Sequence, residues 1–165
     1  MDWHLPLVIS ALIFAAFLVF KLRPAMGENG RTRAAGLKAA QERLAAAKGE
    51  RERAAALCDA AEACASLGRT GAAISYWVRA MRTDPTSVPI VERAASSLAH
   101  RPGAIEKVMW RKLADTPWTG EGRDATAAAL KALSSAYSRK PKFHPRARAL
   151  AHALEVITPA TEGER

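Results

Sequence analysis

The stretch "GRTGAAISYWVRAMRTDP", from Gly68 to Pro85, carries the pattern that decides the fold. After the opening glycine, Ala73, Trp77 and Ala80 follow one another at helical spacing, so they share one face of a helix. Pro85 closes the segment, because the residue before a proline avoids the helical region. Small residues let a neighbouring helix approach closely, and the tryptophan fills the space beside them. The stretch therefore predicts the second helix of a tightly packed helical hairpin.

The composition extends this prediction to the whole chain. The 165 residues suffice for one modest domain, 49% are hydrophobic, and many of these are alanine, the residue with the highest helix propensity. No stretch shows a convincing period-two pattern, so we expect an all-α fold without a sheet. Short breaks rich in proline or glycine separate the predicted helices, which cover residues 31–48, 50–67, 71–83, 88–100, 103–113, 123–138 and 145–157.

The hairpin before Pro85 resembles the tetratricopeptide repeat. Its first helix carries apolar or small residues at the repeat's positions, and its second helix carries the turn glycine, the alanine–aromatic–alanine face and the closing proline. The matching residues are Leu57, Ala60, Ala61 and Cys64, then Gly68, Ala73, Trp77, Ala80 and Pro85. Alanine stands in the usual leucine place and cysteine in the usual tyrosine place of the first helix.

Two weaker units follow. The residue pattern of the first helix recurs 34 residues later. The second helix of that unit, however, has Lys112 near the position of the small crossing residue. The third unit is recovered with a one-residue turn insertion. The residues that carry these units are Val91, Ala94, Ala95 and Leu98, then Leu130, Leu133, Ser134 and Tyr137, then Ala147, Ala151, Leu154 and Pro159. The resemblance covers residues 54–159 and implies a tetratricopeptide-like α-solenoid of about three helical hairpins; the alternatives are a related α-solenoid or an unclassified helical bundle.

An uncharged apolar run from Leu5 to Phe20, which Leu22 extends, predicts a single N-terminal transmembrane helix over residues 5–22, at the short end of the usual length. A signal peptide and a buried core helix are the alternatives, although the first four residues lack the basic charge that a signal peptide uses. The predicted organisation is an external N-terminus (1–4), the transmembrane helix (5–22), a basic linker and helix (23–53), the repeat domain (54–159) and a tail (160–165).

Positive charge follows the apolar run rather than preceding it. Between Lys21 and Arg53 there are nine basic and four acidic residues, so the positive-inside rule places the N-terminus outside and the body in the cytoplasm. A periplasmic body is the alternative.

If the resemblance holds, the first helix of each unit lines a groove for a helix or an extended peptide of a partner protein. The predicted groove residues are Cys58, Glu62, Ser66, Glu92, Ser96 and His100. This set lacks the lysine, arginine and asparagine with which related domains hold a C-terminal carboxylate.

A second candidate surface is the run "SRKPKFHPRAR" from Ser138 to Arg148, which has no acid, in a chain whose net charge is +9. It is a solubilising face, or it contacts anionic lipid or an acidic protein through Arg139, Lys140, Lys142, Arg146 and Arg148. Nucleic acid is a weaker hypothesis, because only Phe143 could stack on bases there.

No pattern in the sequence indicates chemistry. The four histidines do not form a metal-binding or nucleophile motif, and Cys58 and Cys64 lie about 9 Å apart along one predicted helix, too far for a disulfide. We therefore predict no enzyme, no metal and no cofactor. The sequence favours a membrane-anchored scaffold or adaptor that recruits or assembles protein partners; the alternative is a structural accessory subunit of a membrane complex.

Overall fold

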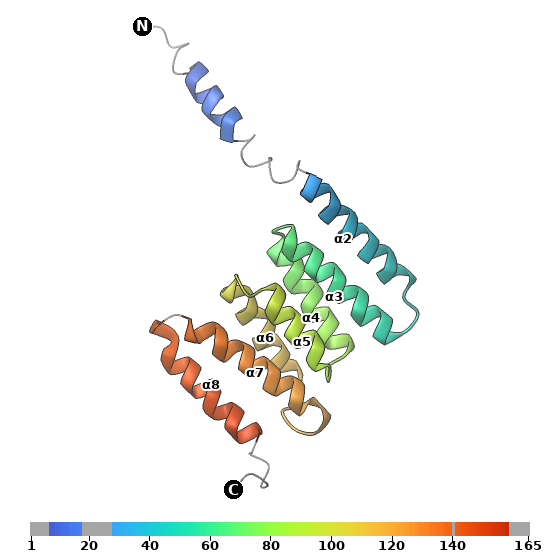
Figure 1. Ribbon diagram of the computed structural model, residues 1–165, viewed down its shortest axis with the longest axis vertical. Helices are drawn as coiled ribbons and strands as arrows, with labels where there is room; N and C mark the ends of the chain where they lie inside the picture. Colours follow the sequence, from blue (N-terminus) through green and yellow to red (C-terminus); the bar gives the residue numbers. More distant parts are fainter. Residues whose placement is uncertain (1–6, 18–27, 140, 159–165) are drawn as a thin grey trace.

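The computed structural model describes residues 7–17, 28–139 and 141–158, and its regular elements in these ranges are all helical, which confirms the all-α prediction (Figure 1). A helix over residues 7–17 precedes the numbered elements. These are α2 (Glu28–Ala46), α3 (Glu50–Ser66), α4 (Thr70–Thr83), α5 (Val88–Ser97), α6 (Pro102–Asp115), α7 (Arg123–Ser138) and α8 (His144–Ile157), with 3-10 turns η1 (Gly120–Gly122) and η2 (Pro141–Phe143).

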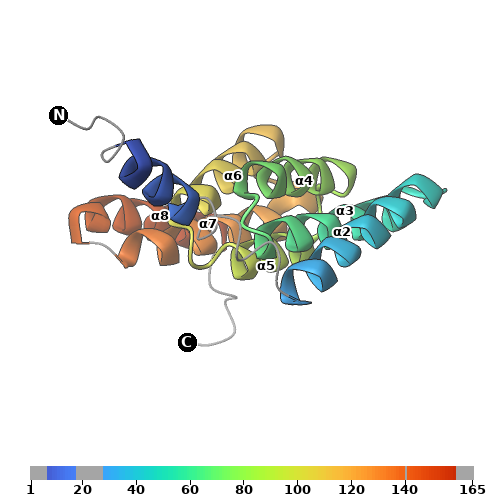
Figure 2. The ribbon, with the colours of Figure 1, turned by 90° about the horizontal axis from the view of Figure 1, so that it is seen from above.

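The helices form two layers (Figures 1 and 2). In the first layer, α2, α3, α5 and α7 lie side by side, with α2 against α3, α3 against α5 and α5 against α7. In the second layer, α4 packs against α6, and each also contacts the first layer. Successive helices run in opposite directions, so the turns α3–α4, α5–α6 and α7–α8 all lie at one end of the stack.

The opening stretch packs as its pattern predicts. Ala73, Trp77 and Ala80 are fully buried in α4, and Ala60 and Ala61 are fully buried in the facing helix α3. α3 and α4 make the most extensive contact between any two elements, because alanines at the crossing allow the backbones to approach closely. The Trp77 ring is thus a core side chain, although its indole N–H has no hydrogen-bond partner among the described residues.

The turn between these helices requires its glycine. Gly68 has φ 77°, a left-handed conformation that side chains with a Cβ adopt only at a cost. The Arg69 backbone N–H donates to the Cys64 carbonyl at 2.9 Å, which closes the end of α3. The glycine therefore lets the chain reverse within three residues.

In α6, a lysine lies where the resemblance would place a small residue. Lys112 is only 3% exposed, and its ammonium group donates to the Pro85 carbonyl and, at 2.7 Å, to the Thr116 hydroxyl. Burial lowers the pKa of Lys112. Lys112 therefore links α6 to the α4–α5 turn through a hydrogen bond, whereas α3 and α4 are held together by close packing of their backbones.

The last hairpin departs from the first two. Among the described elements, α8 contacts α7 and η2 but not α6, so it does not extend the second layer. Ala147 and Leu150 are buried against α7, whereas Ala151, which the resemblance places at the position of Trp77, is exposed. The predicted packing role of Ala151 is therefore wrong, and Pro159 lies outside the described residues.

The predicted transmembrane segment is described only in part. Residues 7–17 are helical, and every one of them is exposed, including Leu12, Ile13 and Phe14. Residues 5, 6 and 18–22 lie outside the described ranges, as do the predicted external N-terminus (1–4), the linker up to residue 27 and the tail (160–165). Within the ranges that are described, no helix is both long enough and apolar enough to cross a membrane.

Candidate partner-binding surface

The outer face of the first layer holds most of the predicted groove residues, but it does not bring all six together. Cys58 is 1% exposed, and burial raises the pKa of its thiol to about 11. Its predicted place on the groove surface is wrong, because the side chain points into the core between α3 and its neighbours.

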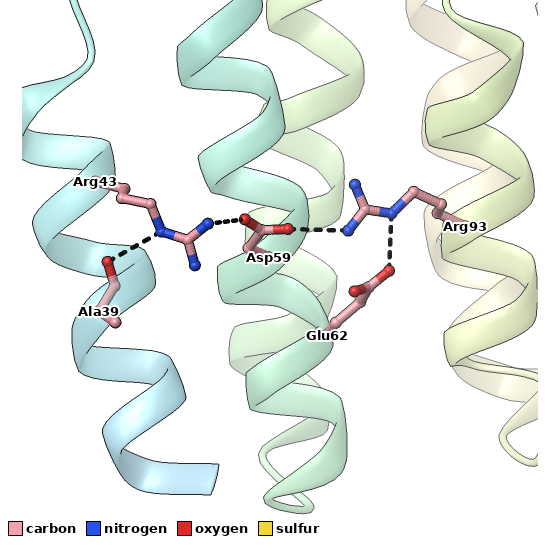
Figure 3. A network of polar contacts seen from close by, with 5 residues as sticks. All are labelled: Ala39, Arg43, Asp59, Glu62 and Arg93. Atoms are coloured by element: carbon pink, nitrogen blue, oxygen red, sulfur yellow. Dashed lines mark hydrogen bonds and ion pairs between the residues drawn. The ribbon is translucent and has the colours of Figure 1, made fainter. Parts of the chain in front are cut away.

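Glu62 belongs to a network of ion pairs that crosses three helices (Figure 3). Arg43 of α2 donates to Asp59 of α3 at 2.7 Å, and Arg93 of α5 donates to the other oxygen of Asp59 at 3.0 Å and to Glu62 at 2.9 Å. The hydrogen bond with Glu62 and the one with Asp59 raise the pKa of Arg93. The network joins the first layer across its outer face and occupies the polar groups that a partner would use between α3 and α5.

Ser66 and His100 lie at the far end of this face. The Ser66 hydroxyl donates to the Ala63 carbonyl at 2.8 Å, and the Ser66 carbonyl accepts from Arg33 at 3.2 Å. His100 is exposed in the α5–α6 turn. Glu92 and Ser96 are also exposed, but they belong to the body of α5 and face α7. These two predicted residues line one hollow.

That hollow, which we call the α5–α7 groove, is lined by Glu92, Ala95, Ser96, Ala128, Lys131, Ala132 and Ser135 and has a volume of ≈ 390 Å³. Three half-buried alanines line its walls, and exposed serines, Glu92 of α5 and Lys131 of α7 stand around them. The small alanine side chains let the backbone of a partner segment approach closely. The charged groups and hydroxyls can form hydrogen bonds with polar groups of that segment. The groove is therefore shaped for a protein segment rather than for a deeply enclosed small molecule.

The sequence predicted only the α5 side of this groove. α7 carries alanine at 125, 127, 128, 129, 132 and 136, so alanine falls on both its buried and its open face. Buried Leu130, Leu133 and Tyr137 mark the core face, and their positions leave Ala128, Lys131, Ala132 and Ser135 outward. The spacing of the larger apolar residues therefore identifies the buried face of α7, and the opposite face is the open one.

A second hollow, of ≈ 330 Å³, lies between α2 and α3. Its walls include Arg43, Glu52 and Asp59, and Arg43 and Asp59 are already paired across it. A partner in this second hollow would have to displace the Arg43–Asp59 ion pair. The ion pairs found among the described residues do not include Glu92 or Lys131 of the α5–α7 groove. The α5–α7 groove is the more accessible of the two.

The predicted anionic-surface residues gather where α7 turns into α8. Arg139, Lys142, Arg146 and Arg148 are exposed, and Lys140 lies outside the described residues. The Lys142 ammonium is 4.9 Å and the Arg146 guanidinium 5.5 Å from the centre of the Phe143 ring, so both cations contact the same aromatic ring. Phe143 in turn packs against Tyr137 with ring centres 5.5 Å apart. The turn holds its positive charges in an ordered arrangement.

Neither cysteine offers an accessible thiol, since Cys58 and Cys64 are both buried. In the described part of the chain, no three side chains among histidine, cysteine, aspartate and glutamate lie close enough to hold a metal ion. The arrangement on the outer face can hold a protein segment by contact and hydrogen bonding.

Comparisons of the chain with protein-family models, with curated proteins and with solved structures found no match.

Proposed function

We propose that this protein is a membrane-anchored, tetratricopeptide-like adaptor that holds a segment of a partner protein in the α5–α7 groove. The observation that carries the proposal is this groove, whose alanine walls and opposite charges lie on the open face of the first layer. The two-layer order of helices α3 to α6 supports the repeat resemblance, because α4 and α6 succeed one another in the second layer as α3 and α5 do in the first.

The partner segment is a helix or an extended peptide with charges of both signs. Glu92 and Lys131 belong to opposite walls of the groove, so a bound segment would place a basic side chain near the first and an acidic one near the second. The serines at 96 and 135 add hydroxyl groups on the same two walls.

The apolar N-terminal run supplies the anchor in this proposal, with the N-terminus outside and the body in the cytoplasm. Support comes from its uncharged sequence, from the basic residues that follow it, and from the exposure of residues 7–17, which are not part of the described hydrophobic core. A tether of this kind raises the effective concentration of any partner at the same membrane.

Affinity capture from detergent-solubilised membranes tests the proposal. Ser96→Trp with Ser135→Trp fills the groove from both walls, and Arg79→Trp with Arg111→Trp adds the same bulk at exposed sites of the second layer. We expect a protein that co-purifies with the wild type and with the second-layer pair and is lost with the groove pair. If both double variants capture the protein equally well, the partner does not bind in the groove.

The alternative function, an accessory subunit whose transmembrane helix packs in a complex, has one observation in its favour. The exposed helix over residues 7–17 includes the small residues Ser10, Ala11, Ala15 and Ala16, which allow close packing of membrane helices. Replacing residues 5–22 with an unrelated apolar sequence separates the two functions. An adaptor keeps its groove partner after this exchange, whereas a packed subunit loses its complex.

A further inference from the structure

One end of the helix stack carries basic residues from four separate segments. The start of α2 and the turns α3–α4, α5–α6 and α7–α8 all lie at this end (Figure 1). We call it the basic edge and define it by Arg31, Arg33, Arg69, Arg101, Arg139 and Lys142.

Hydrogen bonds between neighbouring segments show that these residues form one edge. Arg33 of α2 donates to the Ser66 carbonyl at the end of α3 at 3.2 Å. Arg101, in the α5–α6 turn, donates to the Thr70 hydroxyl at the start of α4 at 2.7 Å. Arg139, at the end of α7, donates to the Ala99 carbonyl at 2.7 Å. Arg33 thus links α2 to α3, and Arg101 and Arg139 link successive hairpins. Each bonds a neutral oxygen, and the ion pairs found among the described residues do not include these three arginines.

Acidic residues are scarce in the segments that make this edge. Residues 30–34, 66–72, 98–103 and 138–148 contain none, and Glu28 is the first residue of α2. Glu106, in the second turn of α6, is half-buried and accepts a hydrogen bond from the Tyr137 hydroxyl at 2.7 Å. The opposite end carries both signs, with Glu50, Asp84, Asp115 and Glu121 among its turn residues. The charge of the chain is therefore distributed unevenly along the helix axes.

The position of α2 favours one partner for this edge. α2 begins at the basic edge, so the chain that leads to the apolar N-terminal run leaves the helix stack from this end. A basic surface beside a membrane anchor faces the anionic headgroups of the same leaflet. Nucleic acid fits less well, because Phe143 is the one phenylalanine, tyrosine or tryptophan within these four segments of the sequence.

We propose that the basic edge is a docking surface for anionic lipid, which holds the helix stack upright with the α3–α4, α5–α6 and α7–α8 turns against the bilayer. This inference rests on the anchor of the proposed function and adds an orientation to it. In this orientation the α5–α7 groove stands perpendicular to the membrane and opens sideways, free to receive a partner.

The test uses the full chain in vesicles of phosphatidylcholine, with or without phosphatidylserine. In a background of Cys58→Ala and Cys64→Ala, a single cysteine carries a donor dye at Gly103→Cys on the basic edge or at Thr86→Cys at the opposite end, and the lipid carries the acceptor. We expect more energy transfer from position 103 than from position 86 on vesicles with phosphatidylserine. The difference shrinks in high salt, because salt screens exposed charges beyond about 10 Å.

Charge variants make this test specific. Arg31→Gln, Arg69→Gln and Lys142→Gln together remove three exposed charges from the edge, and Lys48→Gln, Arg51→Gln and Arg53→Gln remove three from the other end. Each basic residue near an anionic leaflet changes binding roughly fivefold, so the edge variant lowers lipid-dependent docking by about 100-fold or less, depending on how closely each residue approaches. The control variant keeps the wild-type difference between positions 103 and 86. Equal loss in both variants, or equal transfer from both positions, would overturn the proposal.

Flotation with vesicles of phosphatidylcholine alone in high salt separates this inference from the anchor. A chain that does not float under these conditions has no anchor, and the proposed function fails in that part. The basic edge is then still tested by salt-sensitive flotation with phosphatidylserine, which the edge variant loses and the control variant keeps. Binding of the edge to duplex DNA in preference to these vesicles would contradict it.

Discussion

The first two hairpins occupy equivalent places in the two layers, yet they are held together differently. In α3 and α4, alanines and fully buried Trp77 fill the contact with apolar atoms. In α5 and α6, the contact between the two helices is slight, and buried Lys112 joins the hairpin to the preceding turn through hydrogen bonds. The same arrangement of two helices can thus be stabilised by close apolar packing or by a buried ammonium group that donates hydrogen bonds. Substitutions in the two hairpins should therefore reduce stability for different physical reasons.

Replacing Trp77 with alanine should have the largest effect. It removes a fully buried indole and leaves a cavity, which costs about 3 to 5 kcal/mol of unfolding free energy. Urea unfolding followed by circular dichroism measures this loss. The exposed Trp110 of the second hairpin is the matched control, and its replacement by alanine should cost clearly less. Equal losses would mean that the first hairpin does not depend on its tryptophan.

Lys112→Ala should come next, with a loss of about 2 to 4 kcal/mol, because it deletes a buried side chain and leaves the Pro85 carbonyl and the Thr116 hydroxyl without their donor. Lys112→Met keeps most of the volume and removes the cost of burying a charge, so it should lose about 1 kcal/mol. Equal losses in the two variants, which both lack the hydrogen bonds and differ in volume, would mean that the side-chain volume at this position does not contribute to stability.

The two hairpins should respond to alkaline pH in opposite directions. The Cys58 thiol has a pKa raised from 9.0 to about 11, so the unfolded chain releases this proton first and stability falls between pH 9 and 11 by about 2 to 3 kcal/mol. The pKa of Lys112 is lowered from 10.5, so the native state releases its proton first and this contribution to stability rises as the pH approaches 10.5.

Unfolding of the wild type, Cys58→Ala and Lys112→Met across this pH range separates the two contributions. The stability of the wild type minus that of Cys58→Ala should fall with pH, and the wild type minus Lys112→Met should rise. Two differences of the same sign would show that one of these groups is not buried in the folded chain.

The ion-pair network on the outer face should contribute least. Asp59→Asn removes the carboxylate that Arg43 and Arg93 share, but all these side chains are at least partly exposed to water. Such pairs are worth about 0.2 to 1 kcal/mol each. Urea unfolding at low and at high salt should show a small loss that salt reduces; a loss as large as that of Lys112→Ala would mean that the outer face helps to hold the helices together.

These differences explain what the sequence could predict. Helix positions followed from alanine content and from the proline and glycine breaks, and α7 was predicted with its observed bounds, Arg123–Ser138. Trp77 was recognised as a packing residue because its small neighbours at helical spacing indicate a crossing. Local patterns of this kind are readable in one chain because they depend on residues a few positions apart.

Features that depend on contacts between distant segments were missed. The burial of Cys58 and the ion pairs of Asp59 depend on α2 and α5, and the α7 wall of the groove depends on which alanine face the core covers. Ala151 is exposed because α8 does not contact α6, and the sequence of α8 alone does not predict this lack of contact. The linked arginines of the basic edge likewise join residues more than 30 positions apart, such as Arg101 and Thr70.

The central claim is that a partner lies in the α5–α7 groove, and site-specific photo-crosslinking in native membranes tests it most directly. A photoreactive phenylalanine derivative replaces Ser135 in the groove or Arg111 on the exposed side of α6. We expect one discrete crosslinked product from position 135, absent from position 111 and competed by a groove-binding peptide derived from the captured protein. No product from position 135, or the same product from both positions, would contradict it.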